Sequence, residues 1–127
     1  MRRFDRQGPL RSAIQRDGAC ARLTVRGEVD LTNADFFEEQ ILAAERLAGD
    51  ELIVDLNNVP FMDVAGARVL ARAAARAADN LRQIRVEPSA PVRRLLSALG
   101  PVRLAGLVVD DPAVAARPTE RAFAAMR

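Results

Sequence analysis

A short apolar run between two segments of helical periodicity constrains this chain more than any other feature. Residues 51–56 read Glu-Leu-Ile-Val-Asp-Leu, a nearly continuous run of leucine and β-branched residues. Such a run is typical of a central strand that is covered on both faces. Segments of helical spacing lie on either side, at about 34–48 and 64–79. This alternation predicts an α/β fold with a largely parallel sheet.

The helical segments also have recognisable ends. Thr32 or Asn33 is expected to cap the first helix, and Gly49 is expected at the position just after its end. Asp63 is expected to cap the second helix. A third helix is predicted over about 92–99, and short terminal helices are predicted after Asp111 and from Thr119 to Met126.

The remaining strands complete the sheet. Residues 10–16 and 19–29 are extended in pattern and flank Asp17-Gly18, which favours a type I′ hairpin. Short strands are expected at 83–86 and 107–109. The prediction is therefore a mixed, largely parallel sheet of four to five strands with about four helices packed on it. Residues 1–9 are expected to form an N-terminal arm before a single domain over 10–127, with the packing of the tail after 111 left open.

The residue inventory argues against several classes of function. The chain has no His and one Cys, so Ser-His-Asp and Cys-His catalytic arrangements and typical zinc sites are excluded. No glycine-rich phosphate loop is present. The net charge is only +2, every basic residue is Arg, and no basic cluster with stacking aromatics suggests nucleic acid. We expect a protein that is not an enzyme and needs no cofactor or metal, with Cys20 as a half-buried strand residue.

The expected cellular location follows from two kinds of segment that the sequence lacks. No apolar stretch approaches the length of a membrane helix, and no apolar segment follows the basic start. We therefore expect no signal peptide, no membrane insertion and a cytoplasmic location.

Two features are candidates for binding. Arg68, Arg72 and Arg76 recur at intervals of four, so they share one side of the second helix and could contact anions. The segment 61–67 places two large apolar residues before a helix start with free N–H groups, where an acceptor on another protein could dock. Each feature also has a plain structural interpretation, a solvated helix face and a capped helix.

Three motifs, in order, resemble the STAS family, whose members include bacterial anti-sigma factor antagonists. Gly27-Glu28-Val29-Asp30-Leu31-Thr32 is similar to the family's signature at a strand end. Residues 52–56 with 59–67 are similar to its central signature, which runs Asp-Leu, a loop, then Phe-(Met/Leu)-Asp-Ser. Residues 91–96 resemble its later helix, and the likeness spans about 10–110.

The resemblance implies a docking protein that binds an anti-sigma factor with a serine kinase-like fold and releases it when the Ser after the signature Asp is phosphorylated. Val64 occupies that position here, so the usual switch is lost. The partner-binding residues that the resemblance suggests are Asp30, Leu31, Thr32, Asn33, Met62, Asp63, Val64, Ala65, Gly66 and Arg68.

Two other uses remain open. A degenerate STAS domain could serve as a scaffold subunit of a larger assembly such as a transport complex, and a homodimer fits that use. A nucleotide-sensing domain is the third hypothesis, with the arginine stripe as its phosphate contact.

Overall fold

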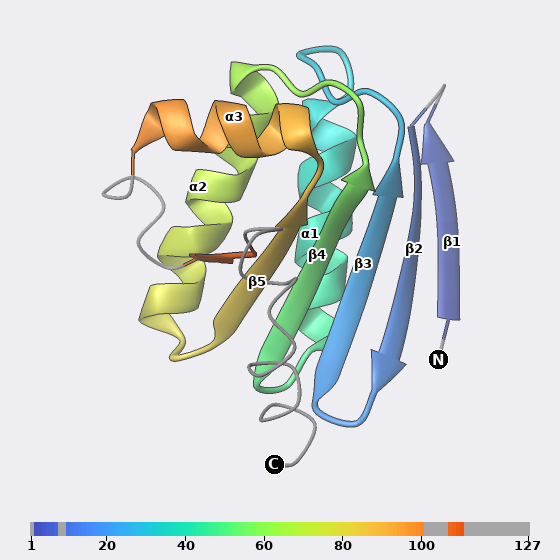
Figure 1. The fold of residues 1–127 in the computed structure, drawn as a ribbon. Helices are drawn as coiled ribbons and strands as arrows, with labels where there is room; N and C mark the ends of the chain where they lie inside the picture. Colours follow the sequence, from blue (N-terminus) through green and yellow to red (C-terminus); the bar gives the residue numbers. More distant parts are fainter. Residues whose placement is uncertain (1, 8–9, 101–106, 111–127) are drawn as a thin grey trace, which may run out of the picture.

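A mixed sheet forms the centre of the structure (Figure 1). The computed structural model describes residues 2–7, 10–100 and 107–110. Within these residues the sheet has six strands in sequence order: β1 (Arg2–Gln7), β2 (Leu10–Asp17), β3 (Cys20–Arg26), β4 (Glu51–Asn58), β5 (Gln83–Pro88) and β6 (Leu107–Val109). The first three strands pair antiparallel, and β3 through β6 pair parallel. The predicted fold class is confirmed, but the described sheet has six strands where four to five were expected, because residues 2–7 add β1.

The described helices are α1 (Ala34–Leu47), α2 (Val64–Asp79) and α3 (Ala90–Leu99). Figure 1 shows α1 and α2 side by side against one face of the sheet, with α3 crossing beside α2. None of the helices in the described part of the chain is long and apolar enough to cross a membrane. The terminal helices expected after 111 lie outside the described residues.

The N-terminal arm differs from expectation. Residues 2–7 form β1, which pairs along its whole length with β2, from Arg2 opposite Gln15 to Gln7 opposite Leu10. The sequence of this segment has no apolar alternation, so the period-two rule could not reveal it. Its pairing depends on the backbone groups that the edge of β2 offers.

The core lies between the sheet and the helices. Fully buried side chains come from both layers: Leu23, Val25, Leu52, Val54, Leu56, Ile84 and Val86 from the strands, with Phe37, Ile41, Val69, Leu70 and Ala73 from the helices. The strand β4 alternates between buried and half-buried residues, so the expectation that both its faces are covered is wrong for the described residues. The half-buried positions of β4 include Glu51 and Asp55, whose charged groups favour the side of the sheet that solvent reaches.

Two local predictions need correction. The hairpin loop is Gly18-Ala19, one residue later than expected, because Asp17 pairs with Cys20. Only Gly18 has positive φ there, at +61°, as in a type II′ rather than a type I′ turn. Gly49 follows the end of α1 as predicted but not in the left-handed conformation; a Cβ on it would lie 3.1 Å from the Ala19 carbonyl oxygen.

Leu81 ends α2 in an unusual way. Its φ is +54°, and the next N–H, that of Arg82, donates to the Ala77 carbonyl at 3.1 Å, as in a Schellman closure. Glycine is the usual residue at this position because a side chain strains the left-handed conformation. The Leu81 side chain is 96% exposed, so packing gives little in return.

Leu81→Gly is therefore expected to raise the free energy of unfolding by about 0.5–1 kcal/mol, the relief of strain less the added flexibility of the unfolded chain. Urea denaturation measures the change. Leu81→Ala keeps the strain and should give no such gain. A glycine variant less stable than wild type would contradict this interpretation.

Candidate functional site

Two loops meet at the carboxyl end of the parallel strands. One follows β3 and the other follows β4. Val29 donates its N–H to the Phe61 carbonyl and accepts from the Asp63 N–H, each at 3.0 Å, and Val29 forms a parallel bridge with Met62. We call residues 30–33 and 61–68 together the two-loop surface. Backbone pairing thus brings together the two sequence motifs, which lie about thirty residues apart in the chain.

Asp63 holds the two loops together through hydrogen bonds to both of its carboxylate oxygens. Its Oδ1 accepts from the N–H groups of Ala65 at 2.9 Å and Gly66 at 3.4 Å, which confirms the predicted cap of α2. Its Oδ2 accepts from the Leu31 N–H of the other loop at 3.2 Å. The same side chain therefore starts the helix and holds the neighbouring loop against it.

Asp30 organises the first loop. One of its oxygens accepts from the Thr32 N–H at 2.9 Å and from the Thr32 hydroxyl. The hydroxyl hydrogen bond is the main cause that lowers the pKa of Asp30 below its usual value. Asn33 occupies the N-cap position of α1, but its side chain does not cap the helix. Its amide oxygen instead accepts from the Asp30 N–H, and its amide nitrogen donates to the Glu28 carbonyl. The expected side-chain cap is therefore absent.

Apolar side chains are exposed on the two-loop surface. Leu31 is 80% exposed, Val64 49% and Phe61 47%. Phe61 lies outside the set of partner-binding residues predicted from the sequence, although its size and its place before a helix start were a signal for it. Other members of that set lie inside: Met62, Asn33 and Gly66 are buried and shape the surface from beneath. A partner can therefore contact Leu31, Phe61 and Val64 directly.

The arginine stripe of α2 is largely engaged within the protein. Arg72 forms two hydrogen bonds with Glu38 of α1, at 2.6 and 3.1 Å, and lowers the pKa of that carboxyl. Arg76 donates to Glu45 of α1 at distances from 2.7 to 3.2 Å. Arg68 is exposed and makes no ion pair with the described residues. The three arginines predicted as anion contacts therefore differ in their availability.

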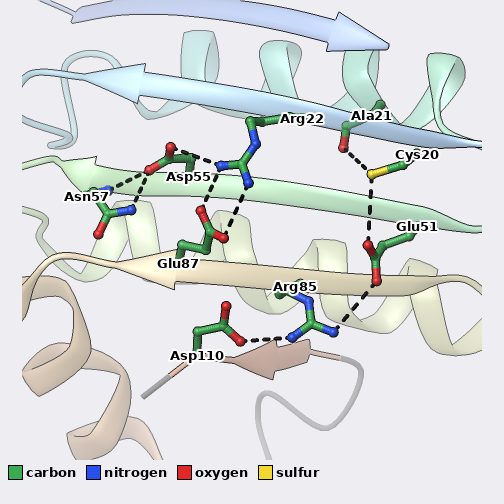
Figure 2. A network of polar contacts seen from close by, with 9 residues as sticks. All are labelled: Cys20, Ala21, Arg22, Glu51, Asp55, Asn57, Arg85, Glu87 and Asp110. Atoms are coloured by element: carbon green, nitrogen blue, oxygen red, sulfur yellow. Dashed lines mark hydrogen bonds and ion pairs between the residues drawn. The ribbon is translucent and has the colours of Figure 1, made fainter. Parts of the chain in front are cut away.

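The sheet face away from the helices has its own polar network (Figure 2). Arg22 of β3 bonds Asp55 of β4 at 3.1 Å and Glu87 of β5 at 2.7 Å, and Arg85 of β5 bonds Asp110 at 3.0 Å. These contacts run across the strands, so they stabilise the strand pairing. Within the described residues, no group of His, Cys, Asp and Glu is arranged to hold a metal ion.

The thiol of Cys20 lies at one end of this network, 3.8 Å from the Glu51 carboxylate. Burial, and then the negative charge of Glu51, raise its pKa above the usual value. A raised pKa disfavours the thiolate, which is the nucleophilic form. The network therefore has the character of a structural ladder of paired charges.

Comparisons with known proteins agree with this architecture. The family model described as "Mlab, STAS domain" matches residues 12–108. An anti-sigma factor antagonist from Mycobacterium paratuberculosis superposes with a TM-score of 0.69 at 19% identity, covering 93% of this chain and 95% of that one. The phosphorylated form of the Bacillus cell fate determinant SpoIIAA gives a TM-score of 0.55 at 15% identity, with both chains covered completely.

A transporter shares the fold as well. The murine anion transporter Slc26a9 gives a TM-score of 0.63 at 19% identity, over 89% of this chain but only 19% of that one. No curated protein sequence is a significant match. At such low identities the solved structures show a common fold, while the family model matches most of the chain. The resemblance found in the motifs is thus confirmed, and the chain belongs to the STAS domain family.

Proposed function

We propose that this protein is a regulatory binding module, similar to the anti-sigma factor antagonists, that docks on an anti-sigma factor with a serine kinase-like fold. One observation carries the proposal: Leu31, Phe61 and Val64 are exposed on a surface that Asp63 holds in one arrangement. Apolar side chains on a fixed backbone are typical of the central contacts of protein interfaces. The proposal needs no catalytic group and places the protein in the cytoplasm.

The proposal includes the loss of the phosphorylation switch. Val64 is the first residue of α2 and half exposed, at the position where the family has its serine. It offers no hydroxyl, and its side chain adds apolar contact area where a phosphate would add negative charge. Binding to the kinase should therefore persist when ATP is present.

Calorimetric titration against each anti-sigma kinase of the source organism, with and without ATP, tests this proposal. Wild type is expected to bind equally in both conditions, whereas Val64→Ser is expected to be phosphorylated and released with ATP. Val64→Asp should bind more weakly throughout because it places a charge in an apolar contact. Val108→Ser is the matched control, since Val108 is also exposed but lies on β6, and it should behave as wild type.

The second candidate is a scaffold subunit of a transport assembly. The likeness to a domain of the murine anion transporter favours it. If no kinase binds either wild type or Val64→Ser, the antagonist proposal fails and the scaffold becomes the leading function. Co-purification from the source organism with membrane transport proteins would then support it.

A further inference from the structure

Two ion pairs join α1 and α2, and the arginine stripe of α2 continues from them to the two-loop surface. Glu38 and Glu45 are seven residues apart, so they lie on one side of α1 two turns from each other. Arg72 and Arg76 follow one another by a turn on α2 and bind these two acids in the same order. The two helices therefore run in the same direction, with a seam of paired charges between them.

Arg68 lies one turn before Arg72 on the same side of α2. The residue seven places before Glu38 is Leu31, which precedes α1 and is the most exposed apolar residue of the two-loop surface. The Leu31 N–H bonds Asp63, so this loop lies at the start of α2. The next acid of α1 before Glu38 is Asp35, in the first turn of the helix; its charge acts on Arg72, and no ion pair joins it to Arg68 among the described residues.

The charge of Arg68 is consequently available at the edge of the apolar contacts. Val64 is one turn earlier on α2, so the two side chains lie on the same side of the helix. Glu38 and Glu45 already bind the other two arginines of the stripe. A guanidinium that has no acidic partner forms its strongest contact with a carboxylate, which it can bind through two parallel N–H groups.

We propose that the partner places a carboxylate against Arg68, beside an apolar pocket that receives Leu31, Phe61 and Val64. This inference rests on the proposed docking function and specifies the chemistry of its partner. The carboxylate binds Arg68 from outside, as Glu38 and Glu45 bind Arg72 and Arg76 within the chain. Arg68 at the rim steers association and fixes the orientation of the complex, and the apolar side chains supply the contact area.

The test measures the binding of full-length wild type and Arg68→Glu to each purified anti-sigma kinase of the source organism by surface plasmon resonance. Arg68→Glu is expected to raise the Kd about tenfold or more and to slow association. The salt dependence of association should be weaker in the variant than in wild type. Arg46→Glu is the matched control: Arg46 is also exposed but lies in the last turn of α1, and its Kd should be that of wild type.

A charge swap identifies the carboxylate. The acidic residues of the kinase surface are changed to Arg one at a time, and one of them is expected to restore binding to Arg68→Glu. If Arg68→Glu binds as tightly as wild type, the inference is overturned while the docking function stands. If wild type binds none of the kinases, the docking function fails and this inference fails with it. Thermal melting of both variants verifies that they fold.

Discussion

Gly66→Ala is expected to lower the free energy of unfolding by about 1–3 kcal/mol, although alanine is the better helix former. Gly66 is buried in the first turn of α2, beneath the two-loop surface. A Cβ at this position would lie 2.6 Å from Met62 Cγ and 2.8 Å from Val29 Cγ1. Val29 is fully buried and β-branched, so it cannot rotate away cheaply. The overlap outweighs the gain in helix propensity, which is about 1 kcal/mol. Urea denaturation measures the loss.

The double variant Met62→Ala/Gly66→Ala separates this overlap from any other effect of the methyl group. Met62→Ala alone leaves a cavity and should be destabilising. In the Gly66→Ala background it also removes one of the two clashes, so the second substitution should cost less than it does in wild type. Purely additive effects would show that the packing against Met62 is not what requires a glycine at this position.

The sequence predicted those parts of the fold that depend on local patterns. The helical period of 34–48, the alternation after Cys20 and the Asp63 cap each require only neighbouring residues, and the structure contains all three. The two motifs of the candidate site were also recognisable. Their meeting follows from the parallel pairing of β3 and β4, which places the loops after both strands at one end of the sheet.

Other features had no local signal. The strand β1 has one apolar residue, Phe4, and therefore no alternation, and the left-handed conformation of Leu81 occurs in a residue type that disfavours it. The second hydrogen bond of Asp63, to Leu31, depends on how two distant loops are placed. Which arginines of the stripe form ion pairs depends on how α1 packs beside α2, and this arrangement cannot be predicted from local sequence. Glu38 and Glu45 are seven residues apart but Arg72 and Arg76 only four, so the spacings gave no signal for the two ion pairs.

Arg76→Met is expected to have an effect comparable to that of Gly66→Ala, lowering the free energy of unfolding by about 2–3 kcal/mol. The Glu45 side chain is only 7% exposed and receives three hydrogen bonds from the Arg76 guanidinium. Removal of the guanidinium leaves a carboxylate away from water without its partner, which costs more than the pair contributes. Because Arg76 itself is partly exposed, water can reach the site in part, and the loss stays below that of a fully buried pair.

Arg72→Met is the matched comparison, since it makes the same substitution at another arginine of the α2 stripe. The Glu38 side chain is 24% exposed and Arg72 is half exposed, so this substitution should cost about 0.2–1 kcal/mol. Glu45→Gln/Arg76→Met removes both charges and should recover part of the loss of Arg76→Met. Guanidinium chloride would screen these charges, so urea is the suitable denaturant. Equal losses for Arg72→Met and Arg76→Met would mean that the burial of the acid does not decide the strength of the pair, and that the seam acts through packing of the arginine stems instead.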